Sequence, residues 1–337
     1  MLQLKSIRFE SIASLKRWIT NDIRRKVQFG LGGIWLIDGL LQLQPYMFTK
    51  QFATDTLQGV GAGQPGFVES SVNAIANFVE PHIVLWNALF AAIQLFIGVA
   101  ILTKRFLKVG LVASFIWTFG VWWFGEAFGQ MLNGSANLLS GAPGAVLLYG
   151  LVGIAVWPPK STREINQKSF VIAEVSPIGE FGMKLVWSIL WAVNAVLQVL
   201  PTSISSDSIK AQISGMASGE PGFIASTDSF IAKLFGNSGT EVSIVMAVVE
   251  LFIAFSIFTK FKNKTLVCAS IFMALVWIFV QNFGGVLTGQ GTDPNSGPLY
   301  ILIALTIYSF KNVKSTNSAE QNSIYGSQIE DKSMLKS

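Results

Sequence analysis

The residues best suited to chemistry are three carboxylates that lie well inside long apolar segments, Asp38, Glu126 and Glu250. No Lys or Arg lies at a comparable depth in these segments. An ionised group in hydrocarbon is costly, so such residues face the protein interior or water. Without a cationic partner, each acid is protonated, hydrogen-bonded to its neighbours, or available to a proton or a cation.

Glu126 lies in an aromatic run, IWTFGVWWFGEAFGQMLNG (116–134), which returns near the C-terminus as VWIFVQNFGGVLTG (276–289). In each copy a Trp, the acid or amide, and a Gly follow at i, i+4 and i+7, which predicts one helical face. Gln281 replaces Glu126 in the second copy. Because an amide holds helices together at a lower desolvation cost, we interpret Glu126 as functional, and the two halves as functionally unequal.

Other polar and aromatic residues share faces with these acids. Asp38 and Gln42 follow Trp35 at i+3 and i+7 on the first predicted helix, and Asn87 and Gln94 share a face of the second. The alternative role for such groups is hydrogen bonding between helices, worth roughly 0.6–2 kcal/mol each. The candidates for a ligand or proton site are Asp38, Gln42, Trp86, Asn87, Gln94, Trp122, Glu126, Glu250 and Gln281.

We expect the face that carries Glu126 to meet the face of the first helix that carries Asp38, in the outer half of the membrane. Two carboxylates close together in a low dielectric cannot both ionise cheaply, so such a pair would hold a proton near neutral pH. His82, at the start of the second apolar segment, is a candidate for proton entry, although a histidine there is more often a simple interfacial residue.

The composition is that of an all-α polytopic membrane protein. Of the 337 residues, 51% are hydrophobic and only 13% are charged, whereas soluble domains carry about 25% charged residues. The fourth and eighth apolar segments are shorter than the roughly 17–25 residues of a typical span, so they form thin spans or are partly re-entrant. The eight predicted spans are 27–46, 82–102, 106–132, 143–157, 182–200, 240–258, 265–287 and 298–310.

The distribution of charge predicts the topology. Of the 24 Lys and Arg residues, 21 lie in the segments that the count places on one side, and the exceptions are Lys50, Lys210 and Lys233. This positive-inside asymmetry predicts that both termini lie in the cytoplasm. No cleavable signal peptide precedes the first span.

An internal repeat organises the chain. A shift of 156 residues superposes most of the two halves, so that Trp35, for example, falls on Trp191. We predict two tandem four-helix bundles related by a pseudo-twofold axis along the membrane normal, because four spans per half give both halves the same orientation. The predicted divisions are a basic segment (1–26), the first repeat (27–157), a cytoplasmic linker (158–181), the second repeat (182–310) and a polar tail (311–337).

Several function classes are excluded or disfavoured by residue counts. The single cysteine, Cys268, cannot form an internal disulfide or a CxxC pair, and the single histidine, His82, excludes a histidine-rich metal or haem site. We predict no metal site. The basic segments suit anionic lipid headgroups better than nucleic acid.

The first span ends in Leu-Gln-Leu-Gln-Pro (41–45), a Pro-Gly outer loop follows it, and a Thr-Lys-Arg turn (103–105) joins the second and third spans. In these motifs the four-span unit resembles the DoxX-like family of bacterial membrane proteins. The run WLIDGLLQLQP (35–45) also resembles a group of bacterial membrane proteins. The resemblance implies a bacterial plasma membrane, a membrane redox partner subunit and a quinone, but no catalytic motif transfers residue by residue.

Three functions follow as hypotheses. The leading one is a redox-linked or quinone-interacting subunit with a polar pocket in the outer leaflet. The alternative is a proton- or cation-coupled transporter of a small solute. The third is a scaffold whose spans hold partner proteins, with homo-oligomers as one form of assembly.

Overall fold

The computed structural model describes residues 23–159 and 169–311. Most of the predicted basic segment, the middle of the predicted linker and nearly all of the predicted tail lie outside the described residues. The remaining predicted divisions, the two repeats, lie within them.

The described residues are almost entirely helical, as predicted. The main helices are α2 (Ile23–Leu41), α5 (Ile83–Leu102), α6 (Leu107–Phe124), α7 (Ala145–Ala155), α8 (Gly179–Gln198), α11 (Gly239–Ser256), α12 (Lys262–Phe279) and α14 (Gly297–Ile307). Short helical elements connect them: η1 (Pro45–Phe48), η2 (Phe52–Leu57), α3 (Gln58–Gly61), α4 (Gly66–Val79), η3 (Glu80–His82), η4 (Phe128–Gln130), η5 (Ile172–Val175), α9 (Ser208–Met216), α10 (Gly222–Phe235), α13 (Asn282–Gly285) and η6 (Val286–Thr288). A two-residue strand, β1 (Ser169–Phe170), pairs antiparallel with β2 (Phe310–Lys311).

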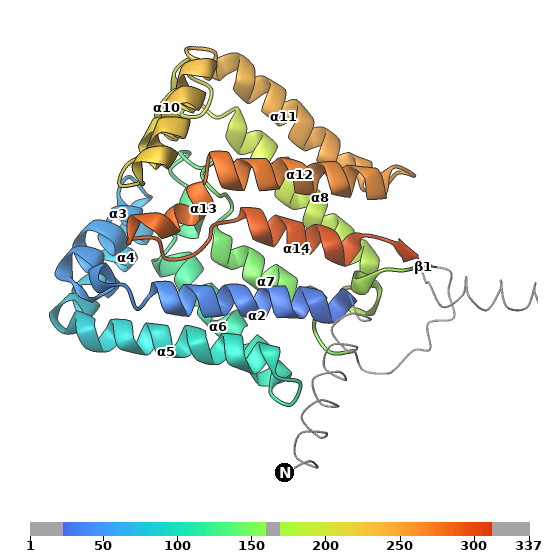
Figure 1. The fold of residues 1–337 in the computed structure, drawn as a ribbon, viewed down its shortest axis with the longest axis horizontal. Coiled ribbons are helices and arrows are strands. Elements are labelled where there is room, and N and C mark those ends of the chain that lie inside the picture. Colours follow the sequence, from blue (N-terminus) through green and yellow to red (C-terminus); the bar gives the residue numbers. More distant parts are fainter. Residues whose placement is uncertain (1–22, 160–168, 312–337) are drawn as a thin grey trace, which may run out of the picture.

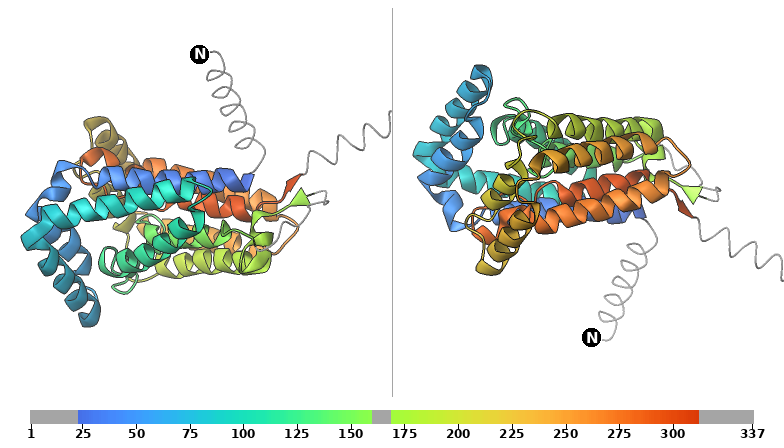
Figure 2. Two further views of the ribbon diagram at one scale, coloured as in Figure 1. Left: turned by 90° about the horizontal axis from the view of Figure 1, so that it is seen from below. Right: turned by 90° about the horizontal axis from the view of Figure 1, so that it is seen from above.

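The main helices lie side by side, and most of the short helices gather at one end of the bundle (Figure 1). That end holds α3, α4, α10 and α13, while the β1–β2 pair lies at the opposite end. Two further views show that α4 projects beyond the bundle on one side and α10 on the other (Figure 2). We call the end with the short helices the outer end, following the predicted topology.

Five helical segments of the described chain are long and apolar enough to cross a membrane. They are Gly66–Leu102, Leu107–Phe124, Gly179–Gln198, Gly239–Ser256 and Lys262–Phe279, and α7 and α14 are shorter apolar helices. Large apolar side chains also cover the outside of the bundle. Examples are Val84, Phe96, Ile116 and Phe252, each more than half exposed. Exposed apolar surface of this kind fits a lipid bilayer environment.

Glycines allow close packing of the helices that position the site. A Cβ atom at Gly32 or Gly98 would meet the facing helix at 2.7–2.8 Å, as would one at Gly39. Because these glycines have no side chain, leucine side chains of the facing helix pack directly on their backbone, and α2 and α5 approach closely. The two halves share one hydrophobic core, in which α7 packs against α14.

The predicted extension of the third span through Glu126 is wrong. Helix α6 ends at Phe124, and the chain then takes a left-handed turn, with positive φ at Ala127, Phe128, Gly129 and Gln130. Glu126 therefore lies in a turn beyond the helix rather than on its face. The matching prediction for the seventh span fails in the same way, since α12 ends at Phe279.

The turn after α6 depends on a glycine. Gly129 has φ of +63°, and a Cβ atom there would overlap the carbonyl of Pro143. The side chain of Trp122 donates from Nε1 to that same carbonyl oxygen at 2.8 Å. These two contacts fold the end of α6 back against the segment that leads into α7.

Candidate functional site

A cavity of about 350 Å³ lies at the outer end of the first half. Helices α2, α5 and α6 form its inner wall, and η2 with α3 and α4 covers it from the outer end. Its apolar wall is rich in aromatic side chains, and none of its described lining residues is Lys, Arg or His. The aromatic lining residues are Trp35, Phe52, Phe90, Trp117 and Phe124.

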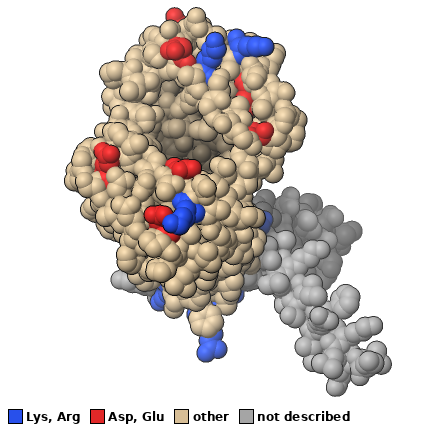
Figure 3. Space-filling model, turned by 90° about the vertical axis from the view of Figure 1, so that its left-hand side faces the viewer, with Lys and Arg blue, Asp and Glu red and all other residues tan. Residues whose placement is uncertain are grey.

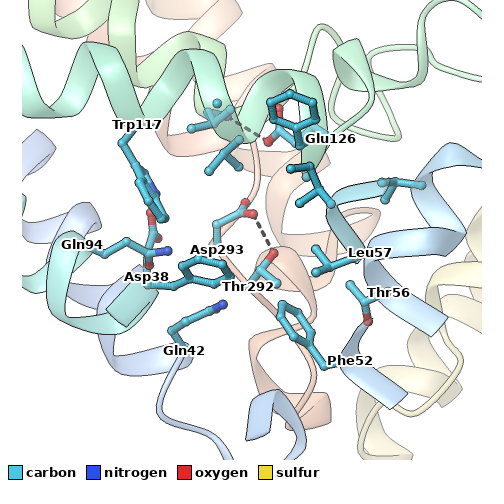
Figure 4. Close-up of a pocket in the computed structure, with 18 of the residues that line it drawn as sticks. Asp38, Gln42, Phe52, Thr56, Leu57, Gln94, Trp117, Glu126, Thr292 and Asp293 are labelled. Atoms are coloured by element: carbon cyan, nitrogen blue, oxygen red, sulfur yellow. Dashed lines mark hydrogen bonds between the residues drawn. The ribbon is translucent and has the colours of Figure 1, made fainter. Parts of the chain in front are cut away.

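Three carboxylates converge on this cavity: Asp38 from α2, Glu126 from the turn after α6, and Asp293 from the loop before α14 (Figure 4). Asp293 is close enough to each of the other two for their like charges to repel. Asp38 and Glu126 thus line the same cavity. The second half completes the site by supplying Asp293.

Glu126 is held by one of its carboxyl oxygens. Its Oε1 accepts a hydrogen bond of 3.0 Å from the backbone N–H of Val146, at the start of α7, where helices have unpaired N–H groups. Its Oε2 is buried beside the backbone of Gly144 and makes no hydrogen bond of normal geometry among the described residues. Oε1 therefore has a structural role, whereas no hydrogen bond fixes Oε2.

Asp38 is surrounded by aromatic rings. The ring of Tyr149 lies 4.5 Å from that of Trp35, and its hydroxyl is close enough to Asp38 to interact with it, although not at normal hydrogen-bond geometry. Trp35 itself donates to Ser114 Oγ at 3.1 Å. Asp38 Oδ1 has no partner among the described residues, and neither has Oε1 of Gln94, which lines the same cavity.

Asp293 lies in a loop that contacts both halves. Its carboxyl accepts hydrogen bonds from the backbone N–H of Asn295 at 2.7 Å and from the hydroxyl of Thr292 at 2.9 Å. Gln44, in the first half, donates to the carbonyl of Gly291 in this loop at 3.0 Å. Asp293 is partly buried at the wall of the cavity, and this burial raises the pKa of its carboxyl above the ordinary value.

The outer cover includes an uncommon element. Residues Phe52–Leu57 form a π-helix, and Phe52, Thr56 and Leu57 from it line the cavity. Such helices are rare and are often found at functional sites. The cover is attached to the turn after α6 by Gln130, which donates to the carbonyl of Val60 at 2.6 Å and accepts from Gln64 at 2.9 Å.

The outer face has few cations. Figure 3 shows this face, hollowed in its middle, with several Asp and Glu side chains and few Lys. The acids of the outer segments are Asp55, Glu69, Glu80, Asp207, Glu220, Asp228, Glu241 and Asp293, against Lys50, Lys210 and Lys233. A negative surface concentrates cations near the entrance of a site.

Not every predicted site residue reaches the cavity. Asp38, Gln42, Gln94 and Glu126 line it. The other candidates, which lie elsewhere, are Trp86, Asn87, Trp122, Glu250, Gln281 and His82. Asn87 supports the wall by donating to the carbonyl of Gln42 at 2.8 Å, whereas His82 is exposed at the end of η3, directly before α5.

Asp293 was missed in the sequence because it precedes the last apolar segment. In the sequence, Asp293 is only one of several acids in the outer connections between predicted spans. In the structure, Tyr149 of α7 and Tyr300 of α14 occupy equivalent positions, so the fourth helices of the two halves align at a shift of 151 residues. At this shift Asp293 corresponds to an uncharged residue, Ala142. An unmatched acid next to a matched proline was the available signal.

The second half repeats the local structure of the first. Trp277 Nε1 donates to the carbonyl of Pro294 at 2.6 Å, as its counterpart in the first half does to Pro143. Gln281 accepts from the backbone N–H of Gly297 at 3.3 Å, in the position of Glu126. The chain turns left-handed after both helices.

The described residues contain no group of three or more His, Cys, Asp or Glu side chains placed to hold a metal ion. The residues that line the cavity provide negatively charged carboxylates and the faces of aromatic rings. Aromatic rings attract cations through their π electrons, particularly organic cations that are weakly hydrated. Comparison with known proteins found no matching family model, curated protein or solved structure.

Proposed function

We propose that this membrane protein binds a small organic cation from the outer side and exchanges it for protons held by the carboxylates of the cavity. The observation that carries the proposal is the convergence of Asp38, Glu126 and Asp293 on one aromatic cavity without a lining Lys or Arg. In this form the function is a proton-coupled transporter of a small solute.

The coupling follows from the electrostatics of like charges. Three carboxylates close together in a low dielectric cannot all be ionised unless a cation joins them. A cation that enters the cavity replaces the protons that keep the acids neutral. A proton that returns from the other side would release the cation, which gives exchange in opposite directions.

The cavity also constrains the shape of the solute. A volume of about 350 Å³ is at the lower end of the range for sites of small molecules, roughly 300–1,000 Å³. The rings of Trp35, Trp117 and Phe124 favour a substituted or quaternary ammonium with an apolar body. A strongly hydrated inorganic ion would gain little from such a wall.

The test is calorimetric binding of benzyltrimethylammonium to the detergent-solubilised full-length protein. We expect binding that weakens about 10-fold or more in Asp38→Asn. Repeating the titration in buffers of different protonation enthalpy should reveal proton release. Binding that is as strong in Asp38→Asn as in the unchanged protein would refute the proposal.

The quinone hypothesis competes directly in the same experiment. A short-chain ubiquinone is uncharged, so its binding should not depend on removing carboxylates one at a time. If the quinone binds and the ammonium does not, the protein belongs with quinone-interacting redox subunits. If neither binds, a scaffold role for partner proteins is the remaining hypothesis.

We also propose the finer topology: eight spans in two four-helix units, related by a pseudo-twofold axis along the membrane normal, with cytoplasmic termini in a bacterial plasma membrane. The equivalent turns after α6 and α12 support the repeat. In a Cys268→Ser background, cysteines at Ser205 and Lys260, both exposed, should differ in labelling by an impermeant reagent on intact cells. Labelling at Lys260 but not Ser205 would overturn the orientation.

A further inference from the structure

Glu250 is a buried acid that the cavity does not use. Its side chain, on α11, is 0% exposed. Neither carboxyl oxygen has a hydrogen-bond partner among the described residues. A buried ionised carboxylate without a donor or a counter-ion is strongly unfavourable, so Glu250 must either hold a proton or pair with a cation.

The polar groups near Glu250 donate their hydrogen bonds to other acceptors. Tyr300, on α14, is within range of an electrostatic interaction with Glu250. Its hydroxyl accepts from Asn194 Nδ2 at 2.8 Å and donates to the carbonyl of Ala142 at 3.2 Å. The same Asn194 nitrogen also donates to the carbonyl of Leu190 at 2.9 Å, which leaves Asn194 Oδ1 buried and unpaired. Acceptors therefore remain on this site, and the nearby donors are used.

The internal repeat places these acceptors together. Asn194 and Glu250 stand where Asp38 and Gln94 stand in the first half, so acid and amide have exchanged positions between the two packed helices. In the first half, Asp38 and Gln94 line one cavity next to the tyrosine of the fourth helix. The same packing of α8 on α11 and α14 brings their counterparts to one place.

The second-half site is closed where the first is open. Gln281, in the position of Glu126, donates to the carbonyl of Leu138 at 3.1 Å and to Ser296 Oγ at 3.0 Å. Its amide nitrogen is thus fully used in hydrogen bonds. Glu250 and Asn194 are fully buried, so a ligand at this site would be enclosed by protein, which suits an atomic ion better than an organic solute.

We propose that Glu250, Asn194 and Tyr300 bind one Na⁺ inside the second half. Hard cations prefer oxygen ligands, and carboxylate, amide and hydroxyl oxygens are all present here. A proton would pair one carboxyl oxygen and leave another acceptor unsatisfied, whereas Na⁺ accepts lone pairs from all of them. A single carboxylate balances one monovalent charge, while a divalent ion would leave a buried net charge.

The direct test is binding of ²²Na⁺ to the full-length protein in detergent, at constant ionic strength maintained with magnesium chloride, since a strongly hydrated divalent ion suits neither this site nor the aromatic cavity. We expect saturable binding that unlabelled Na⁺ displaces and Mg²⁺ does not. Glu250→Gln keeps the shape of the side chain and removes its charge, and it should weaken binding about 10-fold or more. Glu241→Gln removes an acid from the first turn of the same helix and should leave binding unchanged.

A second readout uses the unchanged protein alone, so it does not depend on whether a variant folds. Bound Na⁺ stabilises the folded state by mass action, so the Tm should rise with Na⁺ and not with Mg²⁺ at equal ionic strength. Absence of saturable ²²Na⁺ binding, undiminished binding in Glu250→Gln, or stability that responds to pH but not to Na⁺ would each overturn the proposal. None of these results depends on the organic-cation site, because Glu250 does not line that cavity.

Discussion

Glu126 and Gln281 make the same hydrogen bond in the two halves of the chain. Each side-chain oxygen accepts a backbone N–H at the start of the following helix, from Val146 at 3.0 Å and from Gly297 at 3.3 Å. An amide is therefore sufficient for this structural contact. The charge of Glu126, and its unpaired second oxygen, are left for another role.

Replacing Glu126 with Gln should separate structure from function. The variant copies the second half, so it should fold and keep its Tm within a few degrees, because the hydrogen bond to Val146 is retained. Binding of benzyltrimethylammonium should weaken about 10-fold or more, since one of the three carboxylates is lost. Calorimetry and a thermal melt of the same preparation check both expectations.

Glu126→Ala serves as the matched control. It removes the charge and also the acceptor for the N–H of Val146, which costs about 1 kcal/mol, as the loss of an N-terminal helix cap does. Its Tm should therefore fall below that of Glu126→Gln. If the two variants have the same Tm, the hydrogen bond to Val146 is not stabilising. If Glu126→Gln binds benzyltrimethylammonium as tightly as the unchanged protein, the acid serves only as a helix cap.

The pH dependence of stability should report on Asp293. Burial raises its pKa in the folded protein, while the unfolded chain keeps a value of about 3.9. The unfolded state then releases the proton first, so this group lowers the stability as pH rises between the two pKa values. Above the folded pKa the penalty stays constant.

Asp293→Asn removes this titration. The Tm of the variant minus that of the unchanged protein should increase from about pH 4 towards neutral pH, whatever constant offset its altered hydrogen bonds to Thr292 and Asn295 introduce. Asp38 and Glu126 also face this carboxyl, and they remain in both proteins. Asp55→Asn, at an exposed position, should show no such trend. A difference that is flat with pH would contradict the expected shift.

The sequence was sufficient for the features that depend on composition and periodicity. Apolar runs and sparse charge predicted an all-helical membrane protein, and the repeat predicted that Trp122 and Trp277 are equivalent. Both tryptophans indeed donate to the carbonyl of the proline before the next helix. Asp38 and Glu126 were predicted as site candidates because they are carboxylates inside apolar segments, and both line the cavity.

What could not be predicted depends on local backbone turns and on contacts between the halves. The apolar pattern continues past Phe124, so periodicity gave no indication that α6 ends there. The turn is fixed by tertiary contacts, including the close approach of Gly129 to Pro143. Asp293 reaches the cavity only because the loop before α14 lies against the first half, which Gln44 stabilises.

The two left-handed turns should be intolerant of a side chain. A Cβ atom at Gly129 would overlap the carbonyl of Pro143, and one at Gly284 would overlap that of Asp293. Each glycine also has positive φ, at +63° and +80°, which costs another residue roughly 1 kcal/mol or more. Gly129→Ala and Gly284→Ala should therefore both lower the Tm in a thermal melt.

Gly33→Ala is the control for these substitutions, because it lies inside α2 and its Cβ atom would meet nothing within 4 Å. An alanine there should leave the Tm unchanged or raise it slightly, since alanine favours a helix over glycine by about 1 kcal/mol. If Gly129→Ala is as stable as Gly33→Ala, the turn after α6 has a different backbone from the one described.

Gln130 should control access to the cavity. It connects the turn after α6 to the outer cover through Val60 and Gln64, and residues of the cover line the cavity that holds the carboxylates. In Gln130→Ala both of these hydrogen bonds to the cover are lost, so residues 52–64 should open more often. Hydrogen–deuterium exchange of the π-helix and α3 should accelerate, with main helices such as α2 unchanged. The organic cation should then both associate and dissociate faster, with a smaller change in Kd.

Gln58→Ala provides the matched control, because it removes the exposed hydrogen bond between Gln58 and Asn77 on the same cover without loosening its attachment to α6. Equal exchange rates in Gln130→Ala and Gln58→Ala would show that the contacts of Gln130 do not hold the cover closed.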